Sequence, residues 1–181
     1  METVEQVLTA DAPTDTSYQW YAVNTRSRHE KVVHQALQDK GMTSFLPTRQ
    51  VLSQWKDRKK WVEKPLFPGY LFVHTPWAQL DRVTGTRGVA YLVGDGSSAI
   101  PIPDDQVQGI RQMVEAPCPT MPWPWLKKGK RVRVMAGPLA GLETYIVERK
   151  KNRKSYLILT IELLGRSVAV EIDPRYVEVI P

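Results

Sequence analysis

The chain has 181 residues and a formal net charge of +6, and its 42% hydrophobic and 24% charged residues are typical of a globular protein with a buried core. Its single cysteine, Cys118, excludes an intrachain disulfide and therefore a disulfide-stapled secreted scaffold. Its apolar runs span only a few residues, whereas a membrane span needs about 20, and no signal peptide follows Met1, so we expect a cytoplasmic protein without membrane contact.

The charge is distributed unevenly along the chain. Residues 1–17 hold four acidic side chains and no basic one, whereas residues 126–181 hold twelve basic and six acidic ones. Basic residues cluster within 56–60, 127–133 and 149–154. Such clusters neutralise phosphates in proteins that bind nucleic acids, but lysines at hairpin tips also keep strand edges from aggregating. Charge alone leaves both interpretations open.

The N-terminal residues predict a tail, a strand and a helix. Residues 1–17 are acidic and aperiodic, which is typical of disorder, and the aromatic and β-branched residues of 18–24 predict a strand. Residues 29–40 then show a helical pattern of apolar positions. The predicted buried face of this helix comprises Val32, Val33, Ala36 and Leu37, and the predicted capping box comprises Ser27 and Glu30.

Strands and helices alternate in the next stretch. Short apolar runs predict strands, a hairpin with a charged tip and two helices, and this alternation favours a mixed α/β layer structure. The strands are expected at residues 43–46, 70–74 and 89–93, the hairpin at 49–64, and the helices at 77–83 and 104–115. Asp104 and Asp105 fit the start of the last helix, where acidic side chains complement the helix dipole.

An uncharged, proline-rich stretch separates this region from the rest. Residues 116–125 contain four prolines, which resist helix and sheet, so we interpret the stretch as a semi-rigid linker. Alternating apolar residues beyond it predict five short strands that curl into a small β-barrel. They lie at residues 131–135, 144–148, 156–161, 167–172 and 177–180. The predicted organisation is a tail (1–17), a domain (18–115), the linker (116–125) and a barrel domain (126–181).

The sequence lacks the common motifs for catalysis or cofactor binding. It has no phosphate-binding loop that ends in Gly-Lys-Ser/Thr, and no Gly-x-Ser-x-Gly elbow. His29 and His34 lie about 140° apart around a helix, so they do not aim at one metal ion, and His74 and Cys118 are distant in sequence. We therefore predict that the protein is not an enzyme and uses neither a cofactor nor a metal.

Several stretches, taken in order, resemble a known family. They are Trp20-Tyr-Ala-Val23, Pro65-Leu-Phe-Pro-Gly-Tyr-Leu-Phe-Val73, Thr86-Arg-Gly-Val-Ala-Tyr-Leu-Val-Gly94 and Pro101-Ile-Pro103, followed by Gly129-Lys-Arg-Val-Arg-Val-Met-Ala-Gly-Pro-Leu-Ala-Gly141 and Leu164-Gly-Arg-Ser-Val-Ala-Val-Glu-Ile-Asp173. Together they resemble the NusG family of transcription elongation factors over residues 18–181. The resemblance implies an α+β chain in which a mixed α/β NGN domain is joined by the Pro-rich linker to a five-stranded KOW β-barrel.

The resemblance also implies a partner. In this family the NGN domain docks on the clamp helices of RNA polymerase through an apolar pocket, and aromatic side chains make good anchors because they bury a large area with few rotors. By motif position, Trp20, Phe67 and Tyr70 match aromatic residues of that pocket, and Tyr91 and Leu92 match its neighbouring strand, so all five are predicted to bind RNA polymerase. The same residues also fit an ordinary core, and Pro68-Gly69 also fits a simple turn before the next strand.

Family members further contact DNA near the transcription bubble. Basic residues at the predicted hairpin tip are the candidates for this contact, namely Lys56, Arg58, Lys59 and Lys60. Trp55 and Trp61 flank the tip and could stack on bases, but a cross-strand aromatic pair that stabilises the hairpin is the favoured interpretation. The His-Thr-Thr run with which RfaH-like members contact the polymerase gate loop is absent.

The KOW barrel in this family binds Rho or a small-subunit ribosomal protein. The matching positions in this sequence are Leu139, Leu163, Leu164 and Arg166. Leucines here replace aromatic residues of the housekeeping members, and Thr144 replaces a glycine, which is expected to alter a turn because it removes positive-φ freedom. Both departures favour a specialised paralogue of the UpxY-like or RfaH-like type.

The sequence therefore predicts a monomeric elongation factor that binds RNA polymerase and suppresses pausing or termination in particular operons. Two alternatives stay open, which are a housekeeping NusG that acts with Rho and a KOW-type ribosome- or RNA-binding module. A barrel that switches to helices, as in RfaH, is disfavoured because strands rich in Val and Ile have little helical character.

Overall fold

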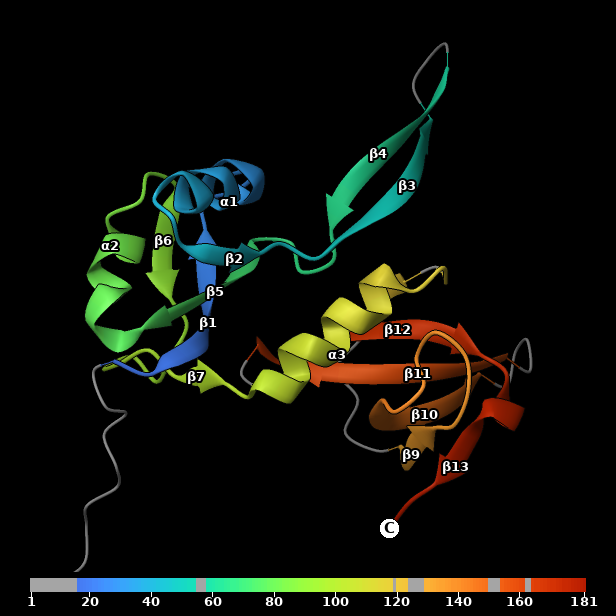
Figure 1. Cartoon of the computed structure of the whole chain (residues 1–181). Coiled ribbons are helices and arrows are strands. Elements are labelled where there is room, and N and C mark those ends of the chain that lie inside the picture. The colour runs from blue at the N-terminus through green and yellow to red at the C-terminus, as the bar shows by residue number, and fades with distance from the viewer. Residues whose placement is uncertain (1–15, 55–57, 119, 124–128, 150–153, 162–163) are drawn as a thin grey trace, which may run out of the picture.

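The computed structural model describes residues 16–54, 58–118, 120–123, 129–149, 154–161 and 164–181. Within these residues the strands form two larger antiparallel sheets and a separate two-stranded hairpin, accompanied by three α-helices (Figure 1). The predicted mixed α/β fold is therefore confirmed. None of the helices in this described part of the chain has the length and apolarity to cross a membrane.

The N-terminal part of the molecule (residues 16–118) is built on the first sheet. Its strands follow the order β2-β5-β1-β6, and β7 pairs with β1 beside β6. The strands are β1 (Tyr18–Thr25), β2 (Thr43–Phe45), β5 (Tyr70–Pro76), β6 (Val89–Leu92) and β7 (Pro101–Ile102), and the helices are α1 (Glu30–Asp39), the 3₁₀ turn η1 (Trp77–Gln79), α2 (Leu80–Thr84) and α3 (Asp104–Glu115). Most predicted elements lie within two residues of these bounds.

The two faces of the first sheet pack against different partners because side chains alternate along each strand. Helices α1 and α2 cover the outer face, where Tyr21 and Val23 of β1 join one hydrophobic cluster. Trp20 and Ala22 point to the opposite, inner face, where they join another cluster. The inner face is the one that carries most of the predicted site.

Helix α1 differs from its prediction in two details. Val33 and Leu37 are buried, but Val32 is 56% exposed, since it lies about 100° around the helix from Val33. His29, and not Ser27, occupies the N-cap position of the helix, and no side-chain hydrogen bond caps this end. The Glu30 carboxylate instead accepts a hydrogen bond of 2.8 Å from the backbone N–H of Gly69. The predicted capping box is therefore wrong, and Glu30 connects the helix to the turn before β5.

Replacing Glu30 with alanine should lower the free energy of unfolding by about 1.5–3 kcal/mol, because the Gly69 N–H loses a charged acceptor and the helix loses an acid in its first turn. Urea denaturation measures this change. Glu30→Gln is the matched control, because its amide oxygen keeps the acceptor and should retain most of the stability. Equal stability of Glu30→Ala and the parent chain would contradict the role of this bond.

The hairpin stands apart from both larger sheets. Strands β3 (Thr48–Gln54) and β4 (Lys59–Pro65) pair only with each other and project from the molecule (Figure 1). Their register places Leu52 opposite Trp61. Leu52 is thus the residue opposite Trp61, and Trp55, the other member of the predicted aromatic pair, lies outside the described residues.

The C-terminal part (residues 120–181) forms the second sheet, in the order β13-β9-β10-β11-β12-β8. The strands are β8 (Thr120–Trp123), β9 (Lys130–Val134), β10 (Glu143–Arg149), β11 (Lys154–Ile161), β12 (Arg166–Ile172) and β13 (Val177–Val179), with the 3₁₀ turn η3 (Pro174–Tyr176) before β13. All five predicted strands are present. The sixth, β8, comes from the stretch predicted to resist sheet structure, and it pairs with β12 at the edge, where Pro122 lies opposite Val168. An edge strand tolerates the missing N–H of proline.

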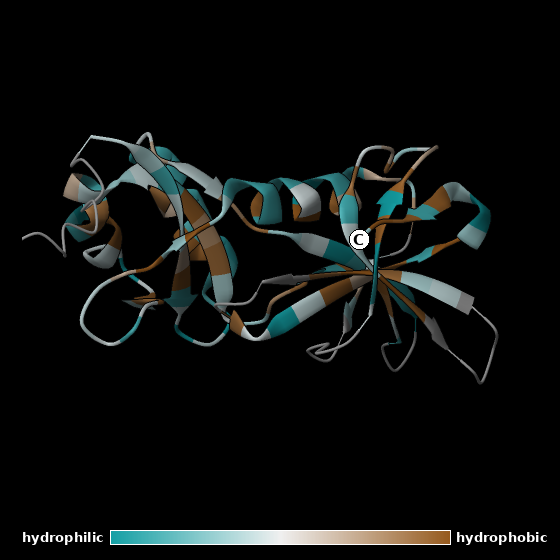
Figure 2. Cartoon of the chain, turned by 90° about the horizontal axis from the view of Figure 1, so that it is seen from below, coloured by the Kyte–Doolittle hydropathy of each residue, from teal (hydrophilic) through white to brown (hydrophobic). Residues whose placement is uncertain are grey.

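Helix α3 lies between the two sheets and packs against both. Its Val107, Ile110 and Met113 are fully buried in a cluster that also contains residues from both sheets. Figure 2 shows hydrophilic and hydrophobic positions side by side on α3, and both kinds along the strands as well. Gly109 lets α3 approach β11 closely, since a Cβ at this position would lie 2.6 Å from Cδ1 of Leu159 on β11. The N- and C-terminal parts therefore share one continuous core.

Candidate functional site

The predicted aromatic residues gather on the inner face of the first sheet. The strand register pairs Trp20 with His74, and pairs Asn24 with both Tyr70 and Tyr91, so all three rings lie on one face. Phe67 precedes β5 and belongs to the same hydrophobic cluster as Trp20. Leu92 does not join them, because it is opposite Val23 and packs with the cluster on the outer face.

Trp20 is the most closely fixed of these side chains. It is 3% exposed, its ring stacks on His74 at 4.8 Å, and its Nε1 donates a hydrogen bond of 2.9 Å to Asp104 at the start of α3. The Arg111 guanidinium lies 5.7 Å from the ring centre. Sequence reasoning missed His74, Asp104 and Arg111 as neighbours of this ring. Asp104 was noticed in the sequence, but only as an acidic residue at the start of a helix and not as a neighbour of Trp20.

Phe67 is buried by the turn that leads into β5. The backbone N–H of Tyr70 donates to the Phe67 carbonyl, with Pro68 and Gly69 between them and Gly69 at a φ of 84°. Proline followed by a glycine of positive φ is the requirement of a type II turn. The Phe67 ring is 1% exposed and meets Phe72 edge to face at 5.8 Å. The simple-turn interpretation of Pro68-Gly69 is thus confirmed.

Tyr70 and Tyr91 lie where the inner face meets the surface. Tyr91 is 55% exposed, and the neighbouring Tyr70 phenol raises the pKa of Tyr91 through charge repulsion and a hydrogen bond. Tyr70 is half-buried, and the Arg166 guanidinium of β12 lies 5.2 Å from its ring centre. Tyr91 is consequently the predicted site ring that is most accessible to a partner.

The residues predicted to bind a second partner face the same region. Leu139 is 3% exposed within the shared core, and Leu164 is half-buried against that core. Arg166 covers Tyr70, as described above, while Leu163 lies outside the described residues. The structure therefore brings the two predicted binding surfaces together, and each covers part of the other. We call this the closed arrangement.

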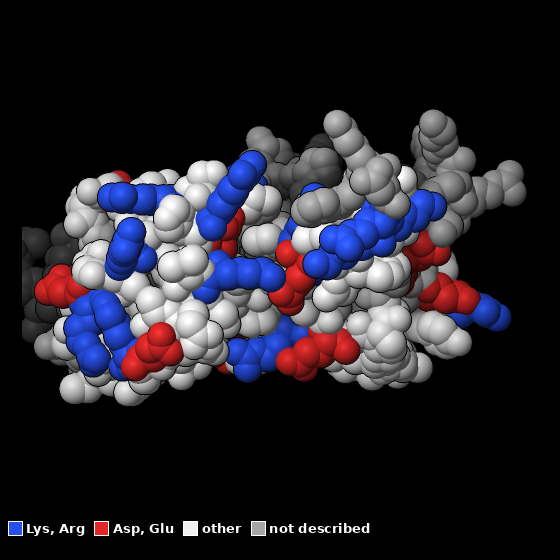
Figure 3. Space-filling model, turned by 90° about the horizontal axis from the view of Figure 1, so that it is seen from above, with Lys and Arg blue, Asp and Glu red and all other residues white. Residues whose placement is uncertain are grey.

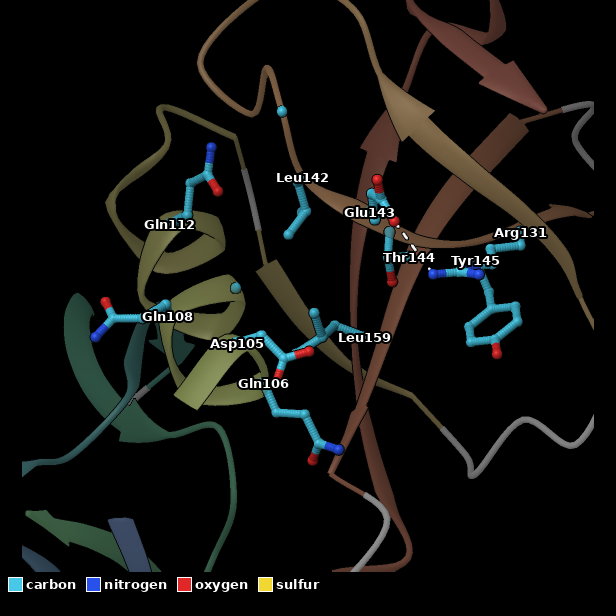
Figure 4. Close-up of a pocket in the computed structure, with 12 residues that line it drawn as sticks. Asp105, Gln106, Gln108, Gln112, Arg131, Leu142, Glu143, Thr144, Tyr145 and Leu159 are labelled. Atoms are coloured by element: carbon cyan, nitrogen blue, oxygen red, sulfur yellow. Dashed lines mark hydrogen bonds and ion pairs between the residues drawn. The ribbon is translucent and has the colours of Figure 1, made fainter. Parts of the chain in front are cut away.

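Two cavities accompany the closed arrangement. One of about 370 Å³ opens beside Trp20 and is lined also by Tyr18, His74 and Asp104. The other, of about 590 Å³, lies between α3 and the second sheet, with Gln108 and Gln112 on one side and Tyr145 on the other (Figure 4). The smaller cavity lies entirely within the N-terminal part, so only the larger one lies between the two parts of the molecule.

The walls of the larger cavity contain an ion pair and Thr144. The Arg131 guanidinium donates to Glu143 at 3.2 Å, and hydrogen bonds from Arg133 hold the pKa of the Glu143 carboxyl below its usual value (Figure 4). Thr144 lies in β10, and its hydroxyl donates to the Ile158 carbonyl. The positive φ angles of this region belong to Gly137 and Gly141. The prediction that Thr144 alters a turn is therefore wrong.

The basic residues of the hairpin are accessible. Arg58, Lys59 and Lys60 are exposed, whereas Lys56 lies outside the described residues. Figure 3 shows that basic side chains on the upper face of the molecule are spread over both parts and interspersed with acidic ones, so no single-sign field covers this face. Among the described residues, no three His, Cys, Asp or Glu side chains are grouped to bind a metal ion.

Comparison with known proteins places these features in a family. The family model described as "Transcription termination factor nusG" matches residues 18–111. The chain is 31% identical to the transcription termination/antitermination protein NusG of Thermus thermophilus, over 87% of this chain and 96% of that protein. It is 28% identical to NusG of Pseudomonas aeruginosa, over 88% and 97% of the two chains.

The fold agrees with these sequence matches. A solved structure concerning domain interaction in Thermotoga maritima NusG superposes with a TM-score of 0.54 and 23% identity, and the match covers 91% of this chain and 98% of that one. The chain therefore belongs to the NusG family of transcription termination/antitermination proteins.

Proposed function

We propose that this protein binds RNA polymerase through the inner face of the first sheet and there suppresses pausing or termination within particular operons. The observation that supports this proposal is the group of aromatic side chains on that face. Tyr91 is 55% exposed beside half-buried Tyr70, and Trp20 and Phe67 form a rigid apolar support behind them. Exposed aromatics on a rigid support are typical of interface hot spots. The clamp helices of the polymerase are the proposed docking partner.

The closed arrangement limits this docking. Arg166 of β12 stacks over Tyr70, and Asp104 and Arg111 of α3 cover Trp20, so a polymerase surface reaches only Tyr91 and the edge of Tyr70. We propose two domains, residues 18–115 and 126–181, that separate when polymerase binds. Separation also uncovers Leu139, Leu164 and Arg166, which become available to a second partner such as Rho or a ribosomal protein.

The proposal favours antitermination over a housekeeping role with Rho. Its support is the presence of leucine at positions 139 and 164, where housekeeping members of the resembled family carry aromatic residues. Leucines give a second partner apolar area but no ring to stack against. The hairpin residues Arg58, Lys59 and Lys60 are the proposed contact to DNA near the transcription bubble, because they are exposed cations on a projecting arm.

Replacing Tyr91 with alanine should weaken binding to RNA polymerase by about tenfold or more, the typical loss for a hot-spot aromatic. Because the ring is largely exposed, the substitution should change stability by less than about 0.5 kcal/mol. Affinity is measured by pull-down or interferometry with purified core polymerase, and function by read-through of a terminator in single-round transcription.

Tyr176→Ala is the matched control, since that tyrosine is 48% exposed on η3, in the other part of the molecule. It should bind polymerase like the parent chain. If Tyr91→Ala also binds and reads through like the parent, the docking face is elsewhere. If the parent chain stimulates Rho-dependent termination instead of read-through, the housekeeping role replaces antitermination.

A further inference from the structure

Strand β8 pairs a piece of the proline-rich stretch with the barrel. It runs antiparallel to β12, with Thr120 opposite Val170 at one end and Trp123 opposite Ser167 at the other. In the chain it lies between α3, which belongs to the core shared by both parts, and β9, where the other strands of the second sheet begin. The second sheet therefore holds the chain at a point between the two parts of the molecule.

Met121 gives β8 a contact of its own on the second sheet. It lies opposite Ala169 and packs against a small hydrophobic cluster that Ala169 forms with Tyr156 and Ile158. This cluster is distinct from the one that contains α3, to which the neighbouring Val168 belongs. Adjacent residues of a strand point to opposite faces, so α3 and Met121 pack on different faces of β12. The two contacts can therefore be broken one at a time.

The pairing of β8 is easier to break than the pairing of the inner strands. Its four residues form few hydrogen bonds with β12, and Pro122 has no N–H to donate. The inner strands of the second sheet pair on both sides, whereas within the described residues β8 pairs with β12 alone. Loss of β8 leaves the five strands β9 to β13 paired with one another. The contact can thus open without disrupting the barrel.

The position of β8 limits how far the two parts can separate. Only residues 116–119 connect α3 to β8, and an extended chain spans at most about 3.6 Å per residue, so this connection reaches about 15 Å while β8 stays paired. When β8 detaches, the connection between α3 and β9 comprises residues 116–129 and reaches about 50 Å. The paired and detached forms of β8 therefore allow two different degrees of separation.

We propose that β8 is a strap, which opens in a second step after α3 has left the second sheet. This inference rests on the proposed separation of the two parts and adds the element that sets its extent. While the strap is paired, the N-terminal part stays beside the barrel and the edge of β12 is covered. When the strap detaches, it frees this edge and the cluster under Met121, next to Arg166 of the proposed second-partner surface.

A reversible disulfide across the strap tests this device. The variant combines Met121→Cys and Ala169→Cys with Cys118→Ser, which removes the native thiol. Directly opposite residues of antiparallel strands have Cα atoms about 4.5–5.5 Å apart, a separation that a disulfide can bridge. Gly109→Gln is added to release α3, because a Cβ at this position would already lie 2.6 Å from Leu159.

Small-angle X-ray scattering is measured on the oxidised and the reduced form of this one protein. The oxidised form should stay nearly as compact as the parent chain, because the connection of about 15 Å keeps the parts together. The reduced form should have a larger radius of gyration and a maximum dimension larger by up to about 35 Å. The same cysteine pair without Gly109→Gln is the matched control, and it should scatter alike in both forms because α3 still holds the parts together.

A second variant tests the strap without a disulfide. Pro122→Val in the Gly109→Gln chain restores an N–H and introduces a residue that favours strands, so it should strengthen the pairing of β8. The radius of gyration should then be smaller than in Gly109→Gln alone.

The scattering curves distinguish failure of the strap from failure of the separation. If the oxidised and reduced forms expand equally, the parts separate without detachment of β8, and the strap is wrong while the separation stands. If both forms stay compact, the parts do not separate in Gly109→Gln, and the proposed separation falls together with the strap.

Discussion

Replacing Gly109 with glutamine should shift the molecule from the closed arrangement to an open one. Gly109 is buried in α3, and even a Cβ atom there would lie 2.6 Å from Leu159 and 3.1 Å from Leu142. Overpacking of this kind costs about 1–3 kcal/mol, which converts to about a 5- to 150-fold shift toward separation. The helix itself should gain stability, since glutamine is a better helix former than glycine.

Small-angle X-ray scattering measures the expected separation as a larger radius of gyration. The substitution should spare the attachment of α3 to the first sheet, because Asp104 and Arg111 make that contact through Trp20 and Phe45. Gln108→Ala is the matched control, because that neighbouring side chain is exposed and should leave the scattering curve unchanged. A parent-like curve for Gly109→Gln would mean that the two parts stay together despite the overpacking.

The same variant connects the closed arrangement to the proposed function. Opening removes Arg166 from Tyr70, so Gly109→Gln should bind RNA polymerase more tightly than the parent chain. If polymerase binds only the open arrangement, the apparent affinity equals the intrinsic affinity multiplied by the fraction of molecules that are open. An open molecule with unchanged polymerase affinity would show that the covered side chains are not part of the docking face.

Local pattern predicted the elements of this fold but not the contacts between them. The strands and α3 follow from alternation and helical spacing, which are properties of neighbouring residues. The burial of Trp20 against Asp104 joins residues 84 positions apart, and the pairing of β8 with β12 depends on an edge that only the assembled sheet provides. Neither contact has a signature in the local sequence.

The strand period separates two of the predicted site residues. Tyr91 and Leu92 are adjacent in β6, and adjacent residues of a strand point to opposite faces, so only Tyr91 shares the inner face with Trp20 and Tyr70. The motif match treated them as a pair, whereas the strand period separates them. Spacing alone also has a limit, as Val32 shows. Its position fitted the predicted buried face of α1, but in the structure Val33 and Leu37 are buried and Val32 is exposed.

Replacing Phe67 with alanine should destabilise the protein by about 3–5 kcal/mol, the usual cost of removing a fully buried ring. The ring is 1% exposed and packs edge-on against Phe72, and the turn that carries it is fixed by Pro68 and Gly69, so the backbone cannot easily collapse into the space left behind. Urea denaturation followed by tryptophan fluorescence measures the loss, with Tyr91→Ala as the exposed-ring control.

The difference in burial between Phe67 and Tyr91 decides which of the two substitutions tests the docking face. Loss of polymerase binding in Phe67→Ala would follow from partial unfolding as readily as from a missing contact, whereas the same loss in Tyr91→Ala identifies a contact. Phe67→Leu provides the intermediate case, because it keeps much of the buried volume and should retain most of the stability. If Phe67→Ala unfolds with a free energy within about 1 kcal/mol of the parent, Phe67 is not the core support that the structure places behind the exposed tyrosines.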